Sequence, residues 1–495
     1  MKPLNWPLLA RKLRPAGRGW SRLGVALGGA GLLALGACAV GPDYHRPTVA
    51  APAAYREATN SAASHSLAEL PWWSVFKDPA LQDLAHVALT NNFDLRIALA
   101  RVDEARALEA QAKSQFLPDV SYEGVASRGR NMFLELPNLN GGQTMNGFVG
   151  GFQALWEIDL WGRVRRLNEA ARANAAATRE LERSIRVSLV SGVAGAYFEL
   201  LELDEKLAIA RRTEESYRHT FQLFDDQHAN GLASKLELAR AKVALHTVSA
   251  TIPDLERQIA LKENEINALL GRNPGPVPRT ATLEQQELPV SIPVGLPSTL
   301  LERRPDIRVA EQQVRAANAQ IGVAIGDFFP RLGLTTFYGG TSVDLDQLVS
   351  TGGNTWSLAA AAAGPVFTGG RLTGRYHQAK AAGEAAKLHY QQTALNAFGE
   401  VADALITRRK VEESCGQQAE AVAAGRDAVV VATDRYRAGK ASYFEVLEAQ
   451  QELYPAENNL AHLEASRRLA VVQLYKALGG GWVLGEAEGA AAPAK

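Results

Sequence analysis

The sequence contains little that would indicate disulfide bonding, a metal site or nucleic-acid binding. Its 495 residues include only two cysteines, Cys38 and Cys415, which are too few for a disulfide framework and are not spaced as metal ligands. Lys and Arg number 53, as do Asp and Glu, and six of the basic residues precede residue 23. Beyond Cys38 the balance is 47 basic to 53 acidic residues. Nucleic-acid binding requires clustered Lys and Arg, so we expect no such partner.

Catalytic motifs are also missing. The sequence has no HExxH pair, no GxSxG and no Walker A motif, because Gly439-Lys440 lacks the upstream Gly and the following Ser or Thr. The nine His are scattered without ligand spacing. We therefore expect a protein that is not an enzyme and that binds neither cofactor nor metal.

The apolar run near the N-terminus is too short to cross a membrane. Residues 23–35 contain only Leu, Val, Ala and Gly, and these 13 residues span about 20 Å against a hydrocarbon core of about 30 Å. A basic segment precedes the run, and the run ends in Leu35-Gly36-Ala37-Cys38. This order predicts an export signal, with a transmembrane anchor as the alternative.

The rest of the chain is an internal duplication. Residues 94–98 (DLRIA) recur as residues 306–310 (DIRVA), and Phe-Leu-Pro at 116–118 recurs as Phe-Phe-Pro at 328–330, both at an offset of 212. Later matches, such as Gly162-Arg163 with Gly370-Arg371, have an offset of 208. The chain therefore consists of two copies of one unit with a loop of different length.

Each copy contains a long helical hairpin. Apolar residues recur in steps of three and four from about residue 193 to 224 and again from 238 to 269, on either side of Asn230-Gly231. The second copy repeats this pattern around Ala438-Gly439 with smaller and more polar seam residues, among them Cys415, which we expect to be a buried small side chain. Each returning arm contains a proline, Pro253 or Pro455, where we expect a kink.

Four shorter segments have the pattern of β-strands. Residues 116–130, 148–160, 329–340 and 356–367 are rich in Gly and aromatic residues and alternate, as in Phe148, Gly150, Phe152, Ala154, Trp156. Their length suits a tilted crossing of an outer membrane, although a soluble two-hairpin sheet is the alternative. Four strands cannot close a barrel, and open edges are not tolerated in hydrocarbon. Membrane insertion would therefore require an oligomer, and a water-filled conduit favours three or more chains.

These features predict six segments. They are a signal peptide at 1–37, a tether at 38–70, a first repeat at 71–271 (β-hairpin about 116–160, coiled hairpin about 165–271), a Pro-rich linker at 272–304, a second repeat at 305–480 (β-hairpin about 329–367, coiled hairpin about 371–479) and a disordered tail at 481–495.

The chain resembles, end to end, the lipoprotein branch of the TolC-like outer membrane factors, the OprM-like exit ducts of tripartite efflux pumps. The resemblance rests on CAVGPDY at 38–44, WWSVF at 72–76 with DPAL at 78–81, LPS at 296–298 with LERRPD at 301–306, and YRAG at 436–439 with YFEVL at 443–447. It implies an α+β membrane protein, in which a homotrimer forms a 12-stranded transmembrane β-barrel and a long coiled-coil α-barrel. It also implies a periplasmic adaptor and an inner-membrane transporter, often of the resistance-nodulation-division class, as partners in an outer membrane of a Gram-negative bacterium.

The resemblance also assigns roles to individual residues. Cys38 matches the lipidated cysteine of a lipobox, and Ala39, where inner-membrane lipoproteins usually have Asp, implies the outer membrane. A periplasmic gate is implied at Phe444 and Glu448, with Tyr436 and Arg435 holding the arms together; the family has Asp where this chain has Glu448. The hairpin turns are implied to contact the adaptor, and their candidate residues are Asn230, Gly231, Lys235, Gly439 and Lys440.

The function implied is an exit duct that passively conducts small toxic compounds or drugs out of the cell. Two alternatives are a duct of the same fold that serves protein secretion, and a lipid-anchored coiled-coil spacer without a pore. The sequence identifies neither the transported compounds nor the adaptor.

Overall fold

The computed structural model describes residues 39–55, 75–130, 144–286 and 297–480. The described chain divides into two compact units. One contains residues 39–43, 111–170 and 318–380 and includes the strands, and the other contains residues 44–110, 171–317 and 381–480 and is helical.

Six of the described helices form three pairs of equal length, as expected for a duplication. Helices α4 and α8 have 22 residues each, α5 and α9 have 67, and α6 and α10 have 35. At 1.5 Å per residue, each 67-residue helix is about 100 Å long. The bounds are α3 Pro79–Asn91, α4 Phe93–Ser114, α5 Arg163–Ala229, α6 Lys235–Leu269, α7 Pro297–Arg303, α8 Pro305–Gly326, α9 Arg371–Arg437 and α10 Tyr443–Ala477.

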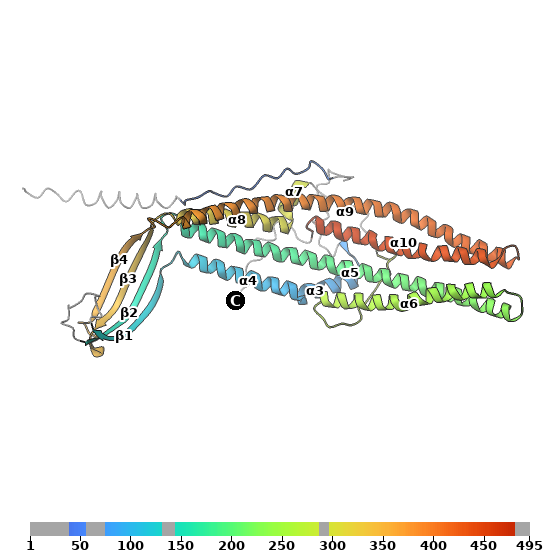
Figure 1. The fold of residues 1–495 in the computed structure, drawn as a ribbon, viewed down its shortest axis with the longest axis horizontal. Coiled ribbons are helices and arrows are strands. Elements are labelled where there is room, and N and C mark those ends of the chain that lie inside the picture. The colour runs from blue at the N-terminus through green and yellow to red at the C-terminus, as the bar shows by residue number, and fades with distance from the viewer. Residues whose placement is uncertain (1–38, 56–74, 131–143, 287–296, 481–495) are drawn as a thin grey trace, which may run out of the picture. The chain divides into compact units, whose positions relative to one another are not determined.

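The pairs α5–α6 and α9–α10 are antiparallel hairpins, as Figure 1 shows. The first turn depends on Gly231, whose φ of +74° is strained for other residues. The Leu232 N–H donates to the Gln227 carbonyl, and Ser234 begins α6 with a capping box that includes Glu237. The second turn repeats the backbone geometry, with Gly439 at φ +67° and the Lys440 N–H donating to the Arg435 carbonyl, but Ser442 forms no side-chain cap. Local chemistry therefore sets where both long helices reverse.

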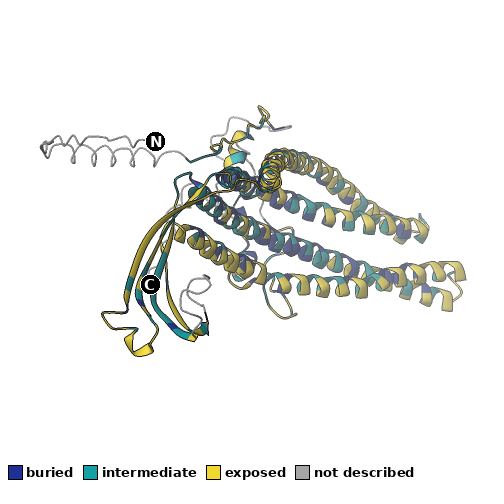
Figure 2. Cartoon of the chain, turned by 60° about the vertical axis from the view of Figure 1, so that its left-hand side comes forward, coloured by how far each residue is buried: buried dark blue, intermediate teal, exposed yellow. Residues whose placement is uncertain are grey.

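The helical unit has a continuous core along the inner faces of the long helices (Figure 2). Tyr197, Leu200, Tyr390 and Leu474 are among its largest fully buried side chains. Cys415 is 5% exposed, which agrees with the sequence interpretation, and its thiol donates to Glu464 Oε1 at 3.1 Å. Burial and the nearby carboxylate raise the pKa of this thiol to about 12.

A second core cluster lies between α5 and α6, the two arms of the first hairpin. Tyr217 of α5 packs with Leu245 and Val248 of α6, and Leu447 of α10 belongs to the same cluster. Helices α6 and α10 continue through their prolines.

The start of α3 and the Pro-rich linker meet at a buried carboxylate. Asp78, 7% exposed, is the N-cap of α3 and accepts from the Ala80 N–H at 2.8 Å. The same carboxylate accepts from Tyr197, Thr280 and Gln286. These donors outweigh burial and hold the pKa of Asp78 below its usual range. Asp78 thereby joins α3, α5 and the first part of the linker.

The strands form one antiparallel sheet in the order β1-β2-β3-β4. Their bounds are β1 Asp119–Arg130, β2 Thr144–Ile158, β3 Arg331–Ser342 and β4 Asn354–Ala363. The register places Asp119 opposite Leu155, Leu155 opposite Thr335 and Thr335 opposite Ala359. All four expected strands are present.

Candidate functional site

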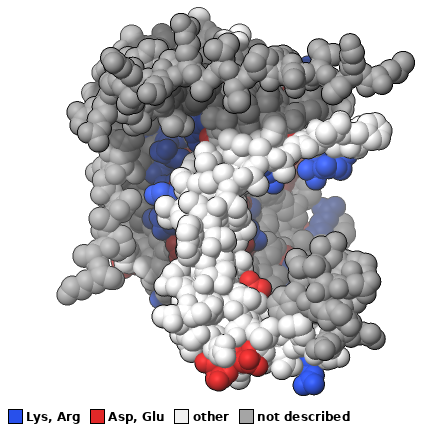
Figure 3. Space-filling model, turned by 90° about the vertical axis from the view of Figure 1, so that its left-hand side faces the viewer, with Lys and Arg blue, Asp and Glu red and all other residues white. Residues whose placement is uncertain are grey.

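Within the described residues, the sheet has no protein core on either face. Among the strand residues whose burial is described, only Gly147 and Gly340 are buried, and Figure 2 shows the strands as exposed or intermediate. Figure 3 views the molecule from the side on which Figure 1 labels the strands, and most of the described surface there carries neither basic nor acidic residues. A sheet of this kind requires a partner or a membrane to cover it.

The two faces of the sheet differ in polarity. Residues directly opposite one another share a face. One row consists of Tyr122, Phe152, Tyr338 and Trp356, which are between 63% and 85% exposed. The adjacent row, on the other face, consists of Ser121, Gln153, Phe337 and Ser357. An apolar face with aligned aromatics and a more polar opposite face is the pattern of a transmembrane barrel wall.

Each outer strand of the sheet is paired on one side only. Within the described residues, β1 pairs only with β2, and β4 only with β3. Unpaired edges are costly in hydrocarbon, so a membrane-spanning sheet must be closed by further copies of the chain. Among the described helices, α5 alone is long and apolar enough to cross a membrane, and 56% of its apolar window is buried inside the protein.

Cys38, the proposed lipidation site, lies outside the described residues. The residues that follow it are held by Arg166 of α5, which is 5% exposed. Its guanidinium donates to the carbonyls of Val40 and Gly41 at 3.3 Å and to Asp43 Oδ1 at 2.7 Å. The Val40 N–H donates to the Trp161 carbonyl. The first residues of the expected tether are therefore bound to the same unit as the sheet.

The five candidate tip residues are all exposed and lie at the turns or directly beside them. Asn230 and Gly231 follow α5, and Lys235 begins α6. Gly439 and Lys440 occupy the corresponding turn between α9 and α10. Neither lysine forms an ion pair with another described residue.

Near the second turn, Tyr436 and Arg435 each contact another helix. The Tyr436 hydroxyl accepts from Gln227 Nε2 of α5 at 3.4 Å. Arg435 Nε lies 3.3 Å from Glu445 Oε2 of α10, and both side chains are about half exposed. The first contact joins the two hairpins, and the second spans one turn.

Phe444 and Glu448 lie on the exposed side of α10. Phe444 is 51% exposed, and the Arg240 guanidinium of α6 lies over its ring at 5.0 Å from the centroid. Glu448 is exposed and has no partner among the described residues. Val446, at 2% exposed, is instead part of the packed face.

Sequence reasoning missed an aromatic cluster beside these residues. The Tyr443 ring packs edge-on against Tyr436 and against Phe224 of α5, with centroids 5.2 and 4.7 Å apart. Its hydroxyl is hydrogen-bonded to Thr220, and burial raises its pKa. Heptad spacing assigns each residue to its own hairpin, so it carries no signal for this contact between hairpins.

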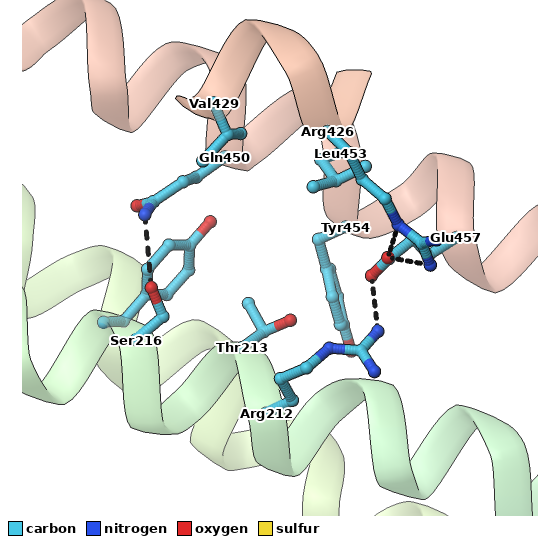
Figure 4. Close-up of a pocket in the computed structure, with 10 residues that line it drawn as sticks. Arg212, Thr213, Ser216, Arg426, Val429, Gln450, Leu453, Tyr454 and Glu457 are labelled. Atoms are coloured by element: carbon cyan, nitrogen blue, oxygen red, sulfur yellow. Dashed lines mark hydrogen bonds and ion pairs between the residues drawn. The ribbon is translucent and has the colours of Figure 1, made fainter. Parts of the chain in front are cut away.

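Farther from the turns, a cavity of about 430 Å³ lies between α5 and the second hairpin (Figure 4). Glu457 of α10, 7% exposed, lies at its wall between two arginines. Its Oε2 is 3.0 Å from Arg212 of α5, and its Oε1 is 2.8 Å from Arg426 of α9. In the same cavity Gln450 donates to Ser216 at 3.2 Å. The cavity is thus bordered by polar links between the hairpins.

The described part of the chain contains no group of three or more His, Cys, Asp or Glu side chains placed to hold a metal ion.

Comparison with known proteins gives consistent matches. The family model for outer membrane efflux proteins matches residues 84–272 and 296–480. The cation efflux system protein CusC of Escherichia coli O6:H1 is 32% identical over 453 residues, which cover 91% of this chain and 97% of that protein. The toluene efflux pump outer membrane protein TtgI of Pseudomonas putida is 35% identical over 461 residues, which cover 91% of this chain and 97% of TtgI.

Solved structures of outer-membrane channels share the fold of this chain over 90% of its length. The outer-membrane channel OprN superposes with a TM-score of 0.83 at 31% identity, covering 90% of this chain and all of that one. The MtrE outer membrane channel of Neisseria gonorrhoeae superposes with a TM-score of 0.81 at 29% identity, covering 90% and 98%.

Proposed function

The chain belongs to the outer membrane efflux protein family, and on that basis we propose how its parts serve as a gated exit duct. The fold is that of a TolC-like trimeric channel, and its function is the outer-membrane exit duct of an efflux pump. Such ducts work with a periplasmic adaptor and an inner-membrane pump. The finer assignments below concern cargo, gate, anchor and partner type.

The observation that best supports a duct is the two-faced sheet with two unpaired edges. Four strands per chain give twelve in a trimer, which is large enough for an aqueous interior. The row of Tyr122, Phe152, Tyr338 and Trp356 would repeat three times around the outside. The row of Ser121, Gln153, Phe337 and Ser357 would line the interior. A spacer without a pore would not require a sheet with one apolar face and one polar face.

The second hairpin closes the periplasmic end at rest. Phe444 forms an apolar constriction, and three Glu448 carboxylates form an acidic ring that attracts cations. Tyr436 and Arg435 hold the arms in the closed arrangement. The contact of Tyr436 with Gln227 supports this role, because it joins the two hairpins and opening would have to break it. The pair of Arg435 with Glu445 holds the two arms of the second hairpin together at its turn.

The remaining assignments concern attachment and partners. Cys38 carries the lipid that anchors the duct to the outer membrane, and the tip residues Asn230, Gly231, Lys235, Gly439 and Lys440 contact the adaptor. The inner-membrane partner is of the resistance-nodulation-division class, and the cargo consists of small toxic compounds or drugs, as toluene is for the relative TtgI.

The test is functional replacement in a bacterium that lacks its own outer membrane channel but keeps adaptor and pump. Expression of this chain should restore resistance to the pump's small-molecule substrates, and the purified trimer should conduct in a planar bilayer. Absence of conductance would favour the spacer. Conductance with restored export of a protein substrate, but with no gain in resistance, would favour secretion.

A further inference from the structure

The lengths of the two outer strands restrict how neighbouring chains can pair. In the trimer, β4 of one chain pairs antiparallel with β1 of the next. β4 has ten residues and β1 has twelve, so every residue of β4 has a partner only if Ala363 lies opposite residue 119, 120 or 121. The polar face of β4 contains Ser357, and that of β1 contains Ser121. If the polar faces of both strands lie on the same side of the barrel wall, residue 120 is excluded, and only residue 119 or 121 can lie opposite Ala363.

Barrel geometry agrees with both registers. Within one chain, the row of directly opposite residues that starts at Asp119 of β1 ends at Ala359 of β4. Between chains, Ala359 would instead lie opposite residue 123 or 125 of the neighbouring β1. The stagger is then 4 or 6 residues per chain. With ~3.3 Å per residue and ~4.8 Å between strands, the strands of a trimer would tilt by about 35° or about 46°. Transmembrane barrels have tilts of about 35–45°.

A basic pocket lies where β4 ends and α9 begins. It has a volume of about 300 Å³, and its lining includes Ala363, Pro365 and three arginines. Asp327 pairs with Arg331 at 3.1 Å and with Arg375 at 3.6 Å, so one carboxylate is shared by two guanidiniums. Arg371 has no acidic partner among the described residues. The pocket therefore has two positive charges in excess, beside an edge strand that another chain must cover.

Asp119 has the complementary charge and position. It is the first residue of β1, it is exposed, and it has no partner in the described part of the chain. In the two allowed registers, Asp119 of the neighbouring copy lies opposite Ala363 or Pro365, and both residues line the pocket. It also shares a face with Arg331, because Arg331 pairs directly with Ala363.

We propose that this pocket receives Asp119 of the neighbouring copy, with Arg371 as its principal partner, and that the resulting ion pair sets the register at which the barrel closes. β4 ends in five consecutive alanines, Ala359 to Ala363, whose small side chains specify register poorly. The two allowed registers differ by two residues, which moves Asp119 by about 6.6 Å, so an ion pair with Arg371 can form in only one of them. The proposal rests on the trimer and is independent of the gate and of the cargo.

Disulfide crosslinking tests the register in the full-length chain. Ser121→Cys combined with Ala361→Cys, or with Ala363→Cys, reports the two allowed registers while Asp119 and Arg371 stay intact. One of these pairs should yield disulfide-linked trimers on mild oxidation, because direct cross-strand partners lie within bonding distance. Glu123→Cys with Ala363→Cys is the control for a slipped register and should crosslink at least tenfold less. Stronger crosslinking of the control than of both Ser121 pairs would overturn the proposal.

Charge exchange tests the ion pair. Asp119→Lys and Arg371→Glu should each raise the rate of trimer dissociation in detergent at least tenfold, and the double exchange should restore most of the parent lifetime. Glu123→Lys, on the same strand and face, should leave the lifetime within about twofold. No recovery in the double variant would show that the two residues do not pair. A parent that is not trimeric by native mass spectrometry would instead contradict the duct itself.

Discussion

Replacing Glu457 with Gln should loosen the attachment of the second hairpin to the first. Glu457 is buried and is bound by Arg426 within its own hairpin and by Arg212 of α5. Glutamine keeps the size and one acceptor oxygen but removes the charge on which both pairs depend. The pair with Arg212 is the one that opening of the second hairpin would have to break, so the variant should favour the open channel.

The size of the expected effect follows from the solvent exposure of the two arginines. Charge-assisted hydrogen bonds are worth about 1.5–3 kcal/mol when desolvated. Arg212 and Arg426 are 58% and 61% exposed, so solvent screens both pairs, and the loss should be about 1 kcal/mol per chain. If the three chains open together, about 3 kcal/mol shifts the open-to-closed ratio roughly 100-fold.

Single-channel recording of the purified trimer at low and high salt is the assay. Glu457→Gln should be open far more often than the parent at ~0.1 M salt, and the difference should shrink at ~1 M, where ion pairs are screened. Glu256→Gln is the matched control, because Glu256 pairs with Arg211 only inside the first hairpin. Equal open fractions for the parent and Glu457→Gln at low salt would refute the reasoning, as would an equal effect of the control.

Four further predictions concern the gate, the tips, the anchor and the fold. Phe444→Ala should raise conductance and Glu448→Gln should reduce cation preference in single-channel recordings; parent-like behaviour of both would place the gate elsewhere. Lys440→Glu should weaken adaptor crosslinking while the trimer stays intact, and unchanged crosslinking would limit the turn to a structural role. Intact mass should show a lipid-modified mature chain of 458 residues beginning at Cys38, and any other N-terminus would disprove that assignment. Asp78→Asn should lower stability by about 2–3 kcal/mol in thermal unfolding. Because the folded pKa of Asp78 is lowered, its contribution is present above pH ~4 and is lost as pH falls through that folded pKa, so acid should destabilise the parent more than the variant.

The sequence predicted the duplicated helices and the strands because both have local periodic signals. Heptad spacing defines the seams, and Gly231 and Gly439 mark the reversals. Alternation identified all four strands, although β2 begins at Thr144, four residues earlier than expected. Element boundaries were thus predictable to within a few residues.

Contacts between hairpins could not be predicted in the same way. Arg212 and Glu457 are 245 residues apart, and each resembles one more charge on an amphipathic helix. The composition of residues 38–70 suggests a tether, yet Arg166, more than 120 residues away in sequence, binds its first residues through the Val40 and Gly41 carbonyls and the Asp43 carboxylate. Interactions of this kind depend on tertiary placement and not on a local pattern.

The two copies of the hairpin have diverged in how their arms are joined, and this difference explains why the second is the better candidate for movement. The first is joined by an apolar cluster that includes Tyr217, Leu245 and Val248, in addition to polar links such as Arg211 with Glu256. In the second, the Cys415 thiol and Gln418 bridge the arms through hydrogen bonds. Apolar packing is lost steeply when helices separate, whereas polar groups exchange partners with water at a net cost of about 1 kcal/mol each. A duplicated fold can therefore keep one hairpin as a rigid wall while the other, attached by exchangeable contacts, opens and closes.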